Sequence, residues 1–373
     1  MAVDFEAEGL VEGLEGRHRE ARLELLRELY EDGVSLEELR EAVAEGRLVL
    51  LPVERVLAGG GGRYTLADIA DEVGVEPETL ARQREALGLP IDDPGAPVGT
   101  EGDLEAARRV RILLDAGLPE DGLLEVTRVI GLAMSQVAAA NRALIVDALV
   151  REDDTELDIA HRFAAAATAL EPLVGEILSH ALRMHLLEQV RHDVLDAVGD
   201  EARPSNTTVV TACFADLVGF TRLGERLPVE ELGAVTGRLA ELAGSAAHGG
   251  VRLVKLIGDG ALLVGAENDA VLEAALRVLE AADQDPDFPP LRIGVARGPA
   301  IARGGDWYGP PVNAAARITA IARPGSILVD EAAKAEAGDG FRFSFAGARR
   351  LRGFREERKL FRLRRSAGAD AGD

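Results

Sequence analysis

Two kinds of hydrophobic pattern divide the chain near residue 200. In the first half, apolar residues recur at spacings of three and four among charged ones, as in amphipathic helices. The clearest segments are Glu20–Tyr30, Ser35–Ala44, Leu104–Asp115 and Ala160–Val198. Helix breakers separate them, including the glycine run 59–62 and the Asp-Asp-Pro-Gly-Ala-Pro stretch 92–97. We therefore expect residues 1–200 to be almost wholly helical, with a long linker helix over about 160–200.

The second half carries short β-branched runs that indicate strands. Strands are expected at Thr207–Phe214, Val251–Ile257, Ala261–Val264, Leu291–Ala296, Ser326–Val329 and Lys359–Arg362. Helical patterns lie between them, at Val229–Ala247, Ala270–Ala282 and Val312–Ile321. This order predicts an α+β domain of ferredoxin-like character over residues 201–373. The boundary is placed at 201–206, where Pro204 stops the preceding helix.

Composition narrows the functional classes. The chain carries 65 acidic and 42 basic residues, a formal charge of −23, which disfavours binding to nucleic-acid backbones and anionic lipid. Its one cysteine, Cys213, excludes an internal disulfide framework and fits a reducing cytoplasm. We see no secretory leader, and the most apolar region, Leu123–Val150, is interrupted by charged residues. We therefore expect a cytoplasmic protein without a membrane span.

The strongest chemical motif of the second half follows its first strand. The strand delivers Asp216 at its C-terminal end, and a glycine-containing turn then opens a helix. Free backbone N–H groups at such a helix start can hold a triphosphate, while the carboxylate holds its metal ion. The residues of this turn are Leu217, Val218, Gly219, Phe220 and Thr221. Taken alone, the motif is equally well explained as an acidic residue that ends a buried strand.

A second aspartate lies in the hairpin Lys255–Gly260. An Asp-Gly turn with positive φ is common in β-hairpins, so the hairpin alone indicates only a turn. In the predicted fold, however, the first strand and this hairpin are neighbours in the sheet, which allows Asp216 and Asp259 to share a metal pair. Two metal ions about 3.5–4 Å apart are what in-line phosphoryl chemistry requires.

A third motif spans Gly305–Arg317. Asn313 and Arg317 follow a Gly-Pro-Pro turn and are four residues apart, so they lie on one face of a helix. An amide and a guanidinium in this arrangement can hold a ribose and a phosphate. In isolation, helix capping and a surface arginine are the simpler explanation of this segment.

Together, the three motifs resemble the class III nucleotidyl cyclase domain over about Thr207–Leu363. Six positions match the active site of that family in order and in spacing, namely Asp216, Lys255, Asp259, Asp306, Asn313 and Arg317. The sequence departs from the family pattern at two places: Pro310-Pro311 replaces the usual Asn-Thr, and Gly260 follows the second aspartate. Neither position supplies a catalytic side chain, so we expect these departures to affect only the rigidity of the loops. A diguanylate cyclase is rejected, since the Gly-Gly-Asp sequence at 304–306 continues with Trp-Tyr and precedes a helix.

The resemblance implies a role for each matched residue. The two aspartates bind two divalent metal ions, Mg²⁺ or Mn²⁺, and Lys255 with Asp306 reads the adenine edge, where guanylyl cyclases typically carry Glu and Cys. Asn313 orients the ribose, and Arg317 stabilises the transition state. ATP would thus yield 3′,5′-cyclic AMP and pyrophosphate by in-line attack of the ribose 3′-hydroxyl. Because family members build each site from two subunits, the resemblance also implies a homodimer with two sites.

Residues 64–90 contain a segment that resembles a helix-turn-helix, with Gly74 at the turn. Its second helix carries Arg82 and Arg84 among three glutamates, whereas a DNA-reading helix normally shows a basic stripe. We therefore expect a structural or protein-contacting role, with DNA binding as the less favoured alternative. For the whole chain, the rival is a transcription regulator whose C-terminal domain senses a nucleotide; the complete active-site set argues against it.

Four of the six histidines fall in the linker region, namely His161, His180, His185 and His192. Solvated positions on a helix explain them, yet histidine changes charge between pH 5 and 8 and such a change can move a helix. The architecture resembles actinobacterial holoenzyme cyclases, whose helical N-terminal domain inhibits the catalytic one and responds to pH. We expect a regulatory N-terminal domain with His180, His185 and His192 as candidate sensors. An apolar effector bound among the helices remains an alternative.

Overall fold

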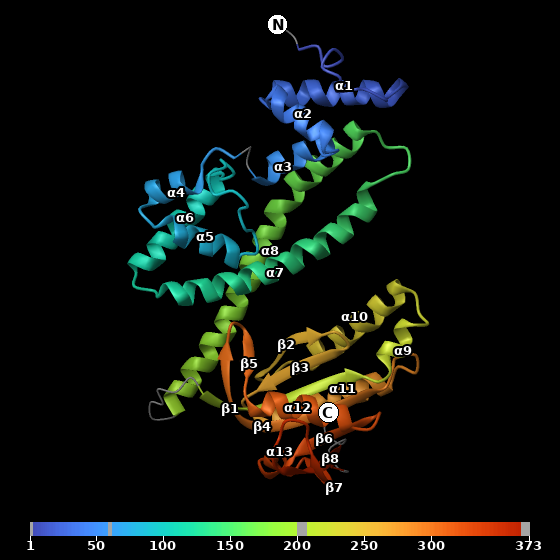
Figure 1. Ribbon diagram of the computed structural model, residues 1–373. Helices are drawn as coiled ribbons and strands as arrows, with labels where there is room; N and C mark the ends of the chain where they lie inside the picture. Colours follow the sequence, from blue (N-terminus) through green and yellow to red (C-terminus); the bar gives the residue numbers. More distant parts are fainter. Residues whose placement is uncertain (1–2, 59–61, 200–206, 367–373) are drawn as a thin grey trace. The chain divides into compact units, whose positions relative to one another are not determined.

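The computed structural model describes residues 3–58, 62–199 and 207–366 (Figure 1). By its internal contacts the chain divides into two compact units, residues 1–190 and 191–373. The boundary predicted at 201–206 lies outside the described residues and stays a prediction.

The first unit is helical throughout, as predicted. Its elements are α1 (Gly16–Glu31), α2 (Leu36–Ala44), a 3-10 turn (Leu48–Leu50), α3 (Leu51–Ala58), α4 (Leu66–Val73), α5 (Pro77–Ala86), α6 (Glu101–Asp115), α7 (Glu120–Leu149) and α8 (Glu156–Gly199). Side-chain caps start several of them: the hydroxyls of Thr65 and Thr100 accept from the N–H groups of Asp68 and Asp103, whose carboxylates accept in return. Helix α8, with 44 residues, corresponds to the predicted linker helix.

The predicted helix-turn-helix is formed by α4 and α5. Gly74 ends α4 in the left-handed conformation (φ 74°), which only glycine adopts at little cost. The arginines of α5 are engaged within the unit: Arg82 contacts Glu120 and Asp121 of α7, and Arg84 pairs with Asp103 of α6. Neutralised in this way, α5 offers little positive charge to a phosphate backbone.

Helix α7 contains the apolar region noted in the sequence. Residues 120–145 form a helical stretch long and apolar enough to cross a membrane by length and composition, and no other helix in the described ranges meets that test. Large side chains on α7 are exposed, with Leu132 at 66% and Leu144 at 74%. The expectation that no segment spans a membrane therefore stays a prediction.

The second unit is built on one mixed sheet in the order β2-β3-β1-β4-β6-β8-β7, with β5 paired to β4. The strands are β1 (Thr207–Leu217), β2 (Val251–Ile257), β3 (Gly260–Gly265), β4 (Leu291–Arg303), β5 (Asp306–Tyr308), β6 (Ser326–Asp330), β7 (Phe341–Arg350) and β8 (Glu357–Arg365). Helices α9 (Phe220–Gly224), α10 (Val229–Ala246), α11 (Asn268–Asp283), α12 (Pro310–Ile321) and α13 (Glu331–Ala335) complete it. The α+β prediction is confirmed.

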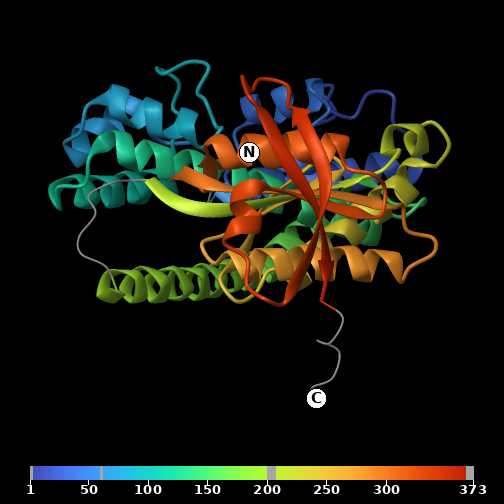
Figure 2. The same cartoon turned by 90° about the horizontal axis from the view of Figure 1, so that it is seen from below.

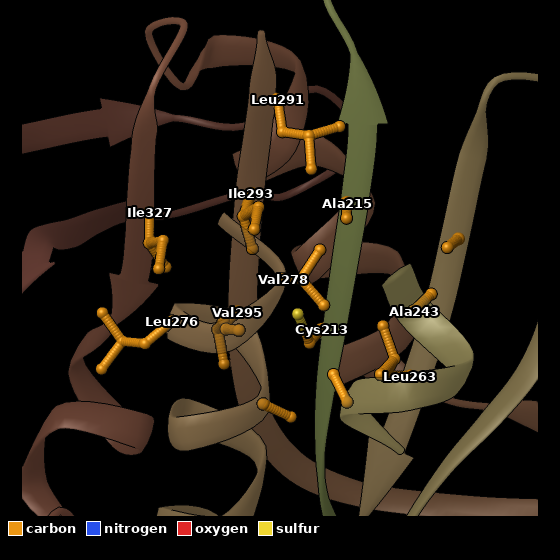
Figure 3. Close-up of a cluster of buried hydrophobic side chains, with 14 of the residues drawn as sticks. Cys213, Ala215, Ala243, Leu263, Leu276, Val278, Leu291, Ile293, Val295 and Ile327 are labelled. Atoms are coloured by element: carbon orange, nitrogen blue, oxygen red, sulfur yellow. The ribbon is translucent and has the colours of Figure 1, made fainter. Parts of the chain in front are cut away.

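Helices cover both faces of this sheet, with α11 on one side and α12 on the other (Figure 2). The alternation of β1 supplies both cores, because Cys213 and Ala215 face α10 and α11 while Val210 and Ala212 face α12. Figure 3 shows the first core, in which Cys213 is fully buried. Burial raises the pKa of its thiol to about 12.

Helix α12 lies directly on the sheet at one glycine. A Cβ at Gly294 of β4 would come within 2.4 Å of the backbone nitrogen of Thr319 in α12. The buried Thr319 hydroxyl donates to the carbonyl of Phe214 in β1 (3.1 Å) or of Ala315 (2.8 Å). These contacts fix α12 against β1 and β4.

Three elements of this unit, β5, β7 and α13, were not predicted from the sequence, whereas α9 is the helix expected after the turn at Gly219. Strand β7 has the alternating sequence Phe-Arg-Phe-Ser-Phe, which is typical of an edge strand, but its run of arginines obscured this pattern. Strand β5 has only three residues and α13 only five. Elements this short carry too few positions for a periodic signal.

Candidate active site

The two aspartates Asp216 and Asp259 lie at the same end of neighbouring strands. Asp216 is opposite Gly260 in the antiparallel pairing of β1 with β3, and the N–H of Leu217 donates to the carbonyl of Asp259 at 3.0 Å. Burial is the main cause that raises the pKa of Asp216, and the negative charge of nearby Asp259 adds to the rise. The predicted juxtaposition of the two is therefore present.

Gly260 has a steric reason at this position. A Cβ there would lie 3.3 Å from the carbonyl of Ala215 and 3.5 Å from Oδ1 of Asp216. A Cβ would therefore be tight against the Ala215 carbonyl and would touch, at ordinary van der Waals distance, the carboxylate from which a metal ligand is expected. This departure from the family pattern therefore leaves room beside Asp216.

Arg292 of β4 is a site residue that the sequence analysis missed. It lies opposite Asp216 in the β1–β4 pairing, and its Nε and Nη2 contact Oδ2 of Asp216 at 2.6 and 2.5 Å. Burial is the main cause that raises the pKa of Asp216, and Arg292 opposes it. A charged residue at the start of an otherwise apolar predicted strand was the available signal.

The predicted turn after β1 is present, but two of its five residues cannot offer a free N–H to phosphate. The N–H of Leu217 donates to the carbonyl of Asp259 (3.0 Å), and that of Val218 donates to the carbonyl of Pro290 (2.9 Å). Gly219 adopts a left-handed conformation (φ 79°) and precedes the five-residue helix α9. Its carbonyl accepts from the N–H groups of Arg222 and Leu223. In the described ranges, the N–H groups of Gly219, Phe220 and Thr221 donate to no protein group.

Lys255 of β2 and Asp306 of β5 form a direct ion pair. Both side chains are partly exposed, at 38% and 20%, and Oδ1 of Asp306 also accepts from the N–H of Trp307 at 2.8 Å. The pair offers one donor and one acceptor side by side, which is the complement of an adenine edge.

Asn313 and Arg317 project from α12 and are both exposed. The helix starts at Pro310-Pro311, where proline suits the first turn. Gly309, just before it, approaches β4 so closely that a Cβ would lie 2.7 Å from the carbonyl of Pro299. In the described part of the chain, no hydrogen bond or ion pair links Asn313 or Arg317 to either aspartate.

Comparison with known proteins identifies both units. Residues 3–190 match the family described as adenylate cyclase regulatory domain, and residues 203–365 match the adenylate and guanylate cyclase catalytic domain. The pH-sensitive adenylate cyclase MT1302 of Mycobacterium tuberculosis is 40% identical over 98% of this chain and 94% of its own. The chain belongs to the adenylate cyclase family.

Two further proteins are similar at lower identity. An adenylate cyclase of Streptomyces coelicolor is 33% identical over 76% of this chain and 74% of its own. The crystal structure of the adenylyl cyclase CyaB from P. aeruginosa aligns with a TM-score of 0.38 and 19% identity, over 43% of this chain and 95% of that one.

The donor set of this adenylate cyclase fits a hard divalent cation. Asp216 and Asp259 would supply two carboxylates, and among the described residues no group of three or more His, Cys, Asp or Glu side chains is arranged to hold a metal. Mg²⁺ is typically held by one or two carboxylates together with waters and substrate phosphates. Asp216 already binds one cationic group, the guanidinium of Arg292, through its Oδ2.

The candidate sensor histidines of the cyclase differ in their surroundings. His180 and His185 are exposed on α8, and the side chain of His192 lies outside the described ones. His161, at the start of α8, contacts Glu28 of α1 through Nε2 at 2.5 Å. The sequence analysis had named His161 but not chosen it among the candidates.

Proposed function

We propose that this protein converts ATP to 3′,5′-cyclic AMP and pyrophosphate as a homodimer whose N-terminal unit regulates activity in response to pH. The observation that carries the proposal is the pairing of Lys255 with Asp306 on a chain that also keeps Asp216 beside Asp259. The pH response rests on similarity to the pH-sensitive relative.

Asp216 and Asp259 are the residues that would hold two divalent ions, Mg²⁺ or Mn²⁺. When bound, such ions neutralise phosphate charge and lower the pKa of the attacking ribose hydroxyl. Arg292 holds Asp216 through two N–H groups, so a metal must displace this guanidinium or share the carboxylate with it. The free N–H groups after β1 would bind phosphate oxygens.

The remaining polar groups would position the nucleoside. Lys255 donates to an adenine ring nitrogen and Asp306 accepts from the adenine amino group, whereas guanine presents the opposite pattern at those positions. Asn313 would orient the ribose, and Arg317 would meet the negative charge that develops on the oxygens of the α-phosphate in the transition state. Catalysis would then rest on positioning and charge neutralisation, without a covalent protein intermediate.

If each active site is built from two copies of this chain, every copy must carry both sets of residues, as this one does. A head-to-tail homodimer would then hold two equivalent sites, each with the aspartates of one chain and Arg317 of the other. We expect the protein to act in the cytoplasm.

Co-expression of two inactive variants tests this proposal. Asp216→Ala and Arg317→Ala should each abolish cyclic AMP formation alone. Random pairing makes half of the dimers mixed, and each mixed dimer has one intact site, so the mixture should regain about a quarter of wild-type activity. If every site were built within one chain, the mixture would stay as inactive as its components. Arg323→Ala, an exposed charge loss just after α12, is the matched control.

A further inference from the structure

The hairpin at one edge of the catalytic sheet concentrates positive charge in an acidic protein. Residues 341–366 contain ten basic and two acidic residues, while the whole chain has a formal charge of −23. Strands β7 and β8 form this hairpin, drawn in red in Figure 2. Its arginines fall on two faces with different surroundings.

On one face of the hairpin, an arginine is paired with carboxylates. Arg365 of β8 reaches α11, where it contacts both oxygens of Glu273 and both of Glu280, at distances between 2.6 and 3.2 Å. These carboxylates raise the pKa of the Arg365 guanidinium. The positive charge of Arg365 is therefore balanced by two glutamates of the same unit.

The opposite face presents arginines to one another. Arg342 lies directly opposite Arg364 in the β7–β8 register, and Arg362, two residues along β8, lies opposite Ser344. Directly opposed residues on antiparallel strands have Cβ atoms about 5 Å apart, and like charges there repel. Among the described residues, no carboxylate pairs with Arg342, Arg362 or Arg364; Arg342 reaches only the Ser366 hydroxyl, at 3.4 Å.

Arg362 adds an independent indication of a ligand. Its Nε is buried and has no hydrogen-bond partner in the described structure. A buried guanidinium N–H without a partner is costly, and an anion that reaches it would recover that cost. On this face, the pairs Arg342–Arg364 and Ser344–Arg362 together offer three guanidiniums and a hydroxyl as hydrogen-bond donors, and neither pair contains a negatively charged group.

We propose that Arg342, Arg362 and Arg364 form a binding site for a multiply charged phosphate anion, separate from the catalytic centre. Guanidiniums suit this ligand because their planar N–H pairs match phosphate oxygens. The charge repulsion between Arg342 and Arg364 favours a ligand with at least two negative charges. The ligand chemistry is a soluble di- or polyphosphate or a phospholipid headgroup. The inference does not depend on cyclase activity.

Calorimetric titration of the full-length protein with inorganic pyrophosphate, in metal-free buffer, tests this site. Wild type should bind one pyrophosphate per chain at this site, and the double variant Arg342→Gln/Arg364→Gln should bind at least about tenfold more weakly. Arg352→Gln removes an exposed charge from the same hairpin outside the cluster and should leave the affinity within about twofold. Asp216→Ala should likewise leave it unchanged, which separates this site from the catalytic one.

A second arm identifies the source of the phosphate. The same proteins are sedimented with phosphatidylcholine vesicles that do or do not contain phosphatidic acid, whose phosphomonoester can carry two negative charges. If sedimentation requires phosphatidic acid and is lost in the double variant, the site binds headgroups. If the protein binds pyrophosphate but does not sediment with these vesicles, the site binds soluble anions. The proposal is overturned if the double variant matches wild type in both arms, or if Arg352→Gln weakens binding equally. Because the double variant removes a repulsive pair, its thermal midpoint should not fall below that of wild type.

Discussion

Both Nε and Nη2 of Arg292 contact the same carboxylate oxygen of Asp216, across the pairing of β4 with β1. A cation therefore already sits on the carboxylate that would bind a metal ion. Arg292→Gln should remove this competitor and tighten Mn²⁺ binding in the absence of nucleotide, by about tenfold. Electron paramagnetic resonance of free Mn²⁺ measures the affinity. Arg252→Gln, an exposed charge loss on β2, should leave the affinity unchanged, and equal affinities for all three proteins would disprove competition.

Arg317→Ala should lower kcat far more than it raises KM. Arg317 is exposed on α12, where it is available to charge that develops only in the transition state. We expect kcat to fall by about 10²-fold or more, with KM for ATP changed by less than about threefold. Steady-state cyclic AMP formation checks both constants. A rise in KM with unchanged kcat would instead indicate a role in ground-state binding.

Thr319→Val should destabilise the catalytic unit. The substitution keeps the shape of the buried side chain but removes the hydroxyl that bonds to Phe214 or Ala315. The free energy of unfolding should fall by about 1–2 kcal/mol in urea titrations. Thr319→Ser, which retains the hydroxyl and loses a methyl group, should remain closer to wild type if the hydrogen bond is what matters.

Asp330→Asn should reveal a pH-dependent stability difference. Burial raises the pKa of Asp330, although the N–H groups of Ala333 and Arg297 and the charge of Arg358 oppose this. The folded state therefore retains the proton that the unfolded state loses, so stability falls as the pH rises from about 3.8 through the raised pKa. Asn keeps an uncharged acceptor at this position.

The advantage of Asp330→Asn over wild type should therefore grow between acid and neutral pH. Urea unfolding at both pH values gives the difference. A gap that narrows toward neutral pH would contradict the direction of this pKa shift.

His161→Gln should weaken the pH response of the cyclase. The contact of His161 with Glu28 joins α8 to α1 and is an ion pair only while the imidazole is protonated. We expect the ratio of activities at about pH 6 and pH 8 to move toward one. His180→Gln, on the exposed surface of the same helix, serves as the control. An unchanged ratio in His161→Gln with an altered one in His180→Gln would favour the histidines chosen from the sequence.

The sequence pattern was enough to predict which site residues are neighbours where their positions depend only on the order of the strands. Asp216 and Asp259 could be paired from the sequence because the β-branched and apolar runs of β1 and of the β2–β3 hairpin identify them as strands, which the predicted fold places side by side. The pairing of Arg292 with Asp216 could not be predicted, because the two residues are 76 positions apart and depend on the register between β1 and β4. A slip of one residue in that register would turn Arg292 to the other face of the sheet. His161 was likewise indistinguishable from the other histidines until its distance to α1 was known.

The burial of Cys213 has a consequence for redox control of this enzyme. The one sulfhydryl of the 373 residues lies fully inside the catalytic core, with a pKa of about 12. Oxidants and electrophiles react with exposed thiolates, which the native protein does not present. Direct thiol oxidation of this chain would therefore leave its cyclic AMP output unchanged.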